Sequence, residues 1–143
     1  MFMDFTVLHA DTECDCLNES VSDSENEYVR KLRKTSVEEK DFQTHWEREL
    51  HQEETDCAKV CSYKAVSVNL FNSDTRDRII EKYTTTFRIN PKKGSFFVRF
   101  KLKDGGGKFK HTPEESDLSH YDFYKADGFN LGHLAIIETV KYS

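Results

Sequence analysis

The sequence predicts an α+β protein with a mostly antiparallel β-sheet of about five to six strands, one main helix and possibly one short helix packed against the sheet. Two patterns carry this prediction. Residues 63–71 and 96–103 alternate with a period of two, which is typical of strands. Phe42, Trp46 and Leu50 recur every four residues, which is the spacing of one helix face. The 143 residues fit a single domain, 1–143.

The N-terminal third is expected to contain one strand, one loop and the main helix. Aromatic and β-branched side chains favour a short strand within residues 1–8. Residues 11–27 are acidic and poor in apolar side chains, so we expect a long mobile acidic loop there. Residues 36–39 have the form of a capping box. The main helix is therefore predicted from about Val37 to Gln52.

The middle of the chain is expected to return to the sheet. A half-buried strand is predicted over residues 63–71. Asp74 then caps a short helix that ends near Tyr83, because the β-branched run Thr84–Thr86 favours a strand. That strand is expected to continue to about residue 89.

The clearest strand, 96–103, is predicted to form a β-hairpin with residues 108–110. Residues 104–107 supply the turn, because Asp and Gly tolerate positive φ. Pro113 ends the return strand, since proline cannot donate to a ladder. Residues 121–125 and 134–140 are predicted as the last two strands. Both faces of 134–140 are largely apolar, which favours a central position in the sheet.

Charge is divided unevenly along the chain. Residues 1–60 carry 16 acidic and 7 basic side chains, whereas the remainder carries 10 acidic and 14 basic. The acidic extreme is 11–27, and the basic extreme is 88–110. Such asymmetry indicates either a charged partner surface or attraction between the two segments.

Several classes of protein are excluded or disfavoured. No apolar run approaches the ~18 to 20 residues that a bilayer requires. The first residues lack the basic start and apolar stretch of a secretory signal, so we expect a cytoplasmic protein. Phosphate-loop, dinucleotide-binding and nucleophile-elbow motifs are absent.

Four cysteines form two close pairs in the sequence, Cys14 with Cys16 and Cys57 with Cys61. Two converging pairs of thiolates can hold zinc, so a zinc-stabilised module is one alternative. The single residue between Cys14 and Cys16 is shorter than the usual zinc spacing. Buried free thiols and adventitious pairing are the other interpretations, and stable disulfides are disfavoured in a reducing compartment.

His111 and His120 offer a second alternative, a small metal-independent ribonuclease-like enzyme. Two imidazoles across a bound phosphodiester can act as general base and general acid. A neighbouring lysine can stabilise charge that develops on the phosphate oxygens. This mechanism requires both rings to face one site.

The basic hairpin has the stronger physical case. Side chains two residues apart on a strand lie ~7 Å apart, a spacing that suits a row of phosphates or carboxylates. The predicted partner-binding residues share one hairpin face: Phe97, Arg99, Lys101, Lys103, Lys108 and Lys110. Phe97 is expected to stack with a base or enter a partner pocket. We therefore expect a non-catalytic interaction module that binds an anionic partner, either an acidic protein surface or a nucleic acid. The acidic loop is a further candidate, because it can mimic phosphates or fold back onto the hairpin.

Overall fold

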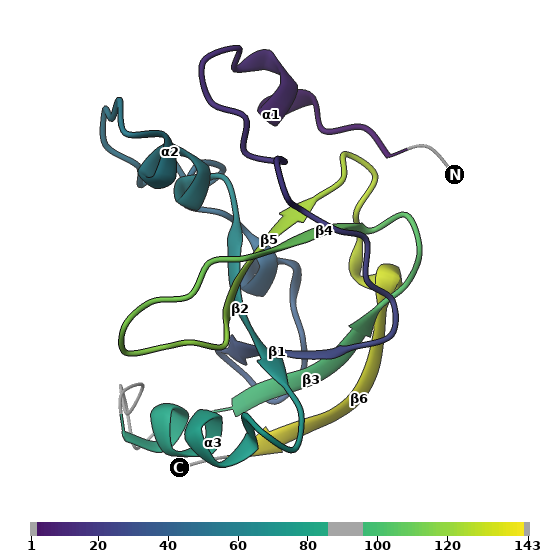
Figure 1. The fold of residues 1–143 in the computed structure, drawn as a ribbon. Helices are drawn as coiled ribbons and strands as arrows, with labels where there is room; N and C mark the ends of the chain where they lie inside the picture. The colour runs from purple at the N-terminus through teal and green to yellow at the C-terminus, as the bar shows by residue number, and fades with distance from the viewer. Residues whose placement is uncertain (1–2, 86–95, 142–143) are drawn as a thin grey trace.

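The computed structural model describes residues 3–85 and 96–141 and has a six-stranded antiparallel sheet as its centre (Figure 1). The strand order is β4-β5-β2-β1-β3-β6. The strands are β1 (Glu27–Leu32), β2 (Val66–Phe71), β3 (Phe96–Leu102), β4 (Gly107–His111), β5 (His120–Lys125) and β6 (Leu134–Lys141). The helical segments are α1 (Thr6–Ala10), η1 (Glu39–Phe42), α2 (Cys57–Tyr63), α3 (Arg76–Thr85) and η2 (Leu131–His133). The predicted mostly-β α+β class is confirmed, although no single helix dominates.

The sheet is strongly curved, and its inner face carries most of the core. Tyr28 of β1 and Phe109 of β4 lie on strands that are not neighbours, yet their rings stack at 3.9 Å. Phe42 closes this core from η1 and is 1% exposed. Alternate residues of the strands supply the remaining apolar side chains, as the period of two predicts.

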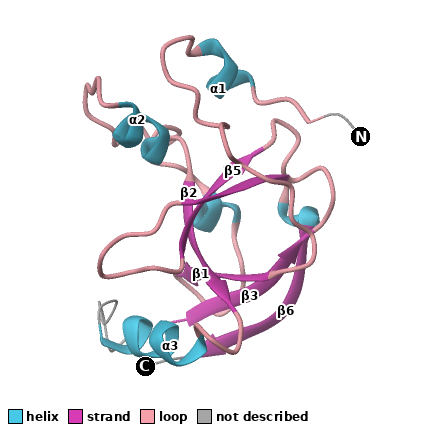
Figure 2. Cartoon of the chain, in the orientation of Figure 1, coloured by secondary structure: helices cyan, strands magenta, loops and turns pink. Residues whose placement is uncertain are grey.

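Helices cover the outer face at its two ends (Figure 2). At one end α3 places Ile79 and Tyr83 against Val29, Phe71 and Phe97. At the other end α1 and α2 pack on Tyr124 of β5, with Cys14 and Cys16 between them. The outer face is therefore covered by two separate apolar clusters.

The predicted helix over Val37–Gln52 is wrong. Only η1 and a further turn at residues 45–49 are helical in character. Arg30 Nε donates to the Asp41 carbonyl at 2.9 Å, which is the acceptor that a continuous helix would offer to residue 45. The amide of Trp46 donates instead to the Tyr63 carbonyl at 2.9 Å. The backbone groups that would form the helical hydrogen bonds thus bond to residues elsewhere in the chain.

The predicted hairpin is also wrong, because β3 and β4 do not pair. β3 lies between β1 and β6, whereas β4 pairs with β5. Residues 103–106 cross between the two strands, held by Lys103 N to His133 O at 2.7 Å and Ala126 N to Gly106 O at 3.0 Å. Gly107 has φ +153°, and a Cβ there would lie 2.2 Å from the Tyr124 carbonyl. This glycine permits close approach to β5 and does not form part of a hairpin turn.

Other element predictions have mixed outcomes. The strands at 63–71 and 121–125 are confirmed as β2 and β5, and the short helix after Asp74 is α3. The first strand is wrong, because residues 6–10 form α1. The last strand is present as β6, but it lies at an edge of the sheet. The strand expected over 84–89 is wrong at Thr84 and Thr85, which belong to α3, and residues 86–89 lie outside the described ranges.

Candidate functional site

The cations predicted to form one stripe are dispersed. Lys101 is exposed on β3, whereas Lys108 and Lys110 are partly exposed on β4, at the far edge of the sheet. Lys103 lies in the crossing segment and is also exposed. The prediction that these cations share one hairpin face is therefore wrong, because the strands that carry them are separated by β5, β2 and β1.

The side chains of Arg99 and Phe97 are engaged in contacts within the protein. Arg99 Nη2 lies 2.8 Å from Glu27, and its Nη1 lies 2.5 Å from Glu138, so one guanidinium joins β1, β3 and β6. Its guanidinium also lies 4.8 Å from the Phe71 ring centre. Phe97 is 1% exposed under α3, so the expectation that its ring is available to a partner is wrong.

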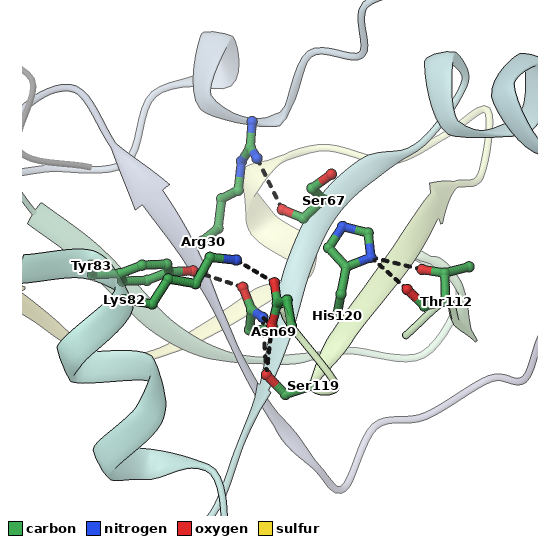
Figure 3. A network of polar contacts seen from close by, with 9 residues as sticks. Arg30, Ser67, Asn69, Lys82, Tyr83, Thr112, Ser119 and His120 are labelled. Carbon is green, nitrogen blue, oxygen red and sulfur yellow. Dashed lines mark hydrogen bonds and ion pairs between the residues drawn. The ribbon is translucent and has the colours of Figure 1, made fainter. Parts of the chain in front are cut away.

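The two histidines occupy different surroundings. His111 pairs with Tyr121 across β4 and β5, and the two rings stack at 4.6 Å. Neighbouring residues on a strand point to opposite faces, so His120 lies on the other side of the sheet. There His120 Nδ1 contacts Thr112 Oγ1 at 2.8 Å (Figure 3). The structure does not bring the two rings to one site, which removes the geometry that the ribonuclease alternative requires.

A buried polar network lies beside His120. Asn69 is 3% exposed, and its Nδ2 donates to Asp117 Oδ1 at 2.8 Å and to Ser119 Oγ at 3.0 Å (Figure 3). Tyr83 donates its hydroxyl to Asn69 Oδ1 at 3.2 Å, and Lys82 forms an ion pair with Asp117. Burial alone would raise the pKa of Asp117, but the hydrogen bonds from Lys82 and Asn69 lower it. A hollow of about 360 Å³ lies next to this network, between α3 and the loop at 112–119. Two charged residues of its wall, Lys82 and Asp117, are already paired with each other.

All four cysteines are oxidised. Cys14 pairs with Cys57 and Cys16 with Cys61, each with Cα atoms 5.3 Å apart. Disulfide sulfurs are not thiolate ligands, so the zinc alternative is wrong for these residues. Among residues 3–85 and 96–141, no group of three or more His, Cys, Asp and Glu side chains is placed to hold a metal ion.

The disulfides also bear on the expected compartment. Such bonds persist in oxidising settings and are rare in the cytosol, so the cytoplasmic expectation is not supported. The helices within the described ranges are too short or too polar to cross a bilayer.

A cleft of about 240 Å³ lies between α1, residues 44–47 and the end of β5. Trp46 is 36% exposed on its wall, and Val7 of α1 is 48% exposed. Phe5, Leu8, Ala126 and Phe129 complete the apolar lining. Thr44 and Glu47 hold the turn that carries Trp46, through reciprocal side-chain to amide hydrogen bonds of 3.0 Å.

Two lysines flank this cleft. Lys64 Nζ lies 4.4 Å from the centre of the Trp46 ring and 3.4 Å from Asp11 Oδ2. Lys125 Nζ lies 2.5 Å from Glu47 Oε1 and 6.0 Å from the Phe129 ring centre. The cations are therefore fixed beside aromatic surface.

The neighbouring carboxylates are kept ionised. Hydrogen bonds from the amides of Glu13 and Cys14, followed by Lys64, lower the pKa of Asp11. Burial alone would raise the pKa of Glu47, but Lys125 and the Thr44 amide lower it. This arrangement provides an apolar recess with charges of both signs along its lining.

Comparison with known proteins adds no relative: no family model, curated protein or solved structure matches the chain.

The sequence prediction missed this cleft. The signal was Trp46, the only tryptophan of the chain, but the four-residue spacing assigned it to a helix face with Phe42 and Leu50. In the structure Phe42 is buried, whereas Leu50 is 58% exposed. The three side chains therefore do not share one buried face.

Proposed function

We propose that the protein is a non-catalytic interaction module of an oxidising compartment, and that it binds a partner protein at the cleft around Trp46. The observation that carries this proposal is Trp46, which is 36% exposed beside Val7 on the wall of the recess while its ring stacks on His51 at 4.1 Å. Tryptophan in such a position is enriched among the residues that dominate binding energy. Adjacent exposed apolar groups with a polar rim are typical of protein interaction sites.

The rim favours a partner segment that has an apolar side chain next to a carboxylate. The apolar side chain would fill the recess against Trp46 and Phe129. Glu47 is 46% exposed, so a partner carboxylate has access to Lys125 by replacing Glu47. The anionic partner expected from the sequence is kept in this proposal, but the cation that would receive it is Lys125.

The first experiment compares affinity capture by the disulfide-intact wild type with capture by Trp46→Ala. The bait is incubated with the extracellular fraction of the source organism at low and high salt. Leu118→Ala is the matched control, because Leu118 is 60% exposed but lines the other hollow. We expect a protein that the wild type and Leu118→Ala retain and that Trp46→Ala loses. High salt should weaken its retention.

A direct titration then tests the same contact. Trp46 is the only tryptophan, so its fluorescence reports on the cleft alone when the partner is labelled at a quenching position. The Trp46→Ala change should weaken the binding free energy by about 2 kcal/mol or more, which is about thirtyfold in affinity. Calorimetry measures this difference. Equal capture by Trp46→Ala and wild type, or recovery of nucleic acid in place of protein, contradicts the proposal.

A further inference from the structure

A three-residue acceptor motif lies on an exposed turn of the acidic segment. Asn18-Glu19-Ser20 has the pattern N-x-S, with a residue other than proline in the middle. Asn18 and Glu19 are exposed, and Ser20 N closes the turn on the Leu17 carbonyl at 3.0 Å. Glu19 has φ 64°, in the left-handed region that tight turns use. The motif is therefore presented on the surface.

The Asn18 side chain is available for modification. The backbone N–H of Asn18 donates to the Asp15 carbonyl at 3.3 Å, whereas its side-chain amide makes no hydrogen bond within residues 3–85 and 96–141. Ser20 Oγ donates to the Leu17 carbonyl at 2.6 Å, which places the hydroxyl on the same short turn. Exposed polar loops of secreted proteins are the usual location of such acceptors.

The disulfides supply the second, independent observation. Cys16 stands two residues before Asn18 and is bonded to Cys61. Disulfides form in the lumen of the secretory pathway, where asparagine-linked glycans are also transferred. The cysteine chemistry therefore indicates an oxidising setting, which the lumen where such a motif is used also provides.

We propose that Asn18 carries an N-linked glycan. In the transfer, Asn18 Nδ2 forms a bond to the anomeric carbon of an oligosaccharide that is supplied as a polyprenyl diphosphate donor. The bond between that carbon and the diphosphate oxygen breaks, the polyprenyl diphosphate leaves, and the amide loses one proton to a base of the transferase. No oxidation or reduction takes place.

The position of the glycan suggests what it does for the fold. Val21, three residues later, pairs with Phe109 through two backbone hydrogen bonds of 2.8 Å. β4 is an edge strand, and Val21 covers part of it. A bulky polar glycan beside this contact would keep other chains from pairing with the edge.

The test directs the full chain into the lumen of a eukaryotic secretory pathway with a cleavable signal. Both the lumenal pool and the medium are treated with peptide N-glycosidase and measured by intact-mass spectrometry. We expect one glycan on the wild type, removed by the enzyme with conversion of Asn18 to aspartate. Asn18→Gln and Ser20→Ala should each lose it, whereas Asn130→Gln should keep it.

A positive control shows that the chain reaches the transferase. Asp74→Ser creates the same motif at Asn72, which is also exposed, and is combined with Asn18→Gln. A wild type that stays unmodified while this double variant is glycosylated overturns the proposal. Reading the lumenal pool makes the result independent of whether a variant is secreted.

Discussion

Asn69 and Asp117 show how single buried polar residues hold distant segments together. Asn69 lies on β2, Tyr83 and Lys82 on α3, and Asp117 in the loop before β5. The Asn69 amide bonds with three side chains, so its burial leaves few unmade hydrogen bonds. Truncating one member leaves the others buried without a partner, which costs more than the bond itself contributes.

Asp117→Asn should therefore lower the free energy of unfolding by about 1–3 kcal/mol at pH 7. The native state holds the pKa of Asp117 below its ordinary value of 3.8, so the stabilisation is present above that pH. It is lost as the pH falls through the lowered native pKa. Urea unfolding at pH 7 and at pH values below 3.8 measures the difference.

Asp104→Asn is the matched control, because Asp104 is exposed. Its stability should follow that of the wild type at every pH. An Asp117→Asn variant whose deficit is unchanged at acidic pH contradicts the assignment of the effect to the ionised carboxylate.

At the scale of one element, β6 is an edge strand with exposed apolar side chains. Ile136 is 49% exposed and Ile137 is 43% exposed. Within the described residues β6 pairs with β3 alone, and the register shifts between Arg99 and Phe100, opposite Ile137. A bulge of this kind distorts an edge and limits its pairing with other chains.

Ile136→Lys should reduce self-association at high protein concentration, because charge on an edge strand opposes pairing with a second chain. The change should cost about 1 kcal/mol or less in stability, since half of the side chain is already exposed. Light scattering over a concentration series measures association. Leu118→Lys, which introduces the same charge away from the edge, should leave association unchanged. Equal effects of the two variants contradict a specific role of β6.

The elements also show where sequence reasoning succeeds. β2 and β5 are confirmed because alternate apolar side chains, among them Val66, Val68 and Phe123, face the main core on one side of the sheet. β1 was missed because Arg30 and Lys31 interrupt its apolar residues. In the structure β1 and β2 pair only over residues 27–29 and 69–71, and Arg30 Nη1 donates to the freed Ser67 carbonyl at 2.9 Å. A strand that contains a charged residue bonded to a neighbouring strand cannot be identified from the alternation of its own apolar and polar residues.

At the scale of the whole molecule, two disulfides fasten the acidic segment to α2. They span 43 and 45 residues of chain. Together with the bridge from Val21 to Phe109, they hold the predicted loop at 11–27 against the outer face. The loop is present, and its mobility stays a prediction.

Removing Cys14–Cys57 with a Cys14→Ser/Cys57→Ser double variant should lower the free energy of unfolding by about 2 kcal/mol, because Cys16–Cys61 still closes the long loop and Cys14–Cys57 adds only a short one. The physical reason is the larger conformational freedom of the unfolded chain without the cross-link. Urea unfolding followed by Trp46 fluorescence measures the loss, because Trp46 lies beside Lys64 at the end of α2. Wild type in a reducing agent should lose at least as much stability. Unchanged stability in both cases contradicts the role assigned to the disulfides.

The sequence by itself determined the antiparallel α+β class, most strands and the unequal charge, because these follow from local alternation and composition. Tertiary structure decided which strands pair, that the cysteines are oxidised, and that Trp46 faces a cleft. Each of these depends on contacts between residues far apart in the chain, such as Cys16 with Cys61 or Arg99 with Glu27. Local spacing carries no information about such contacts, since backbone groups bond to whichever partner the fold brings within reach.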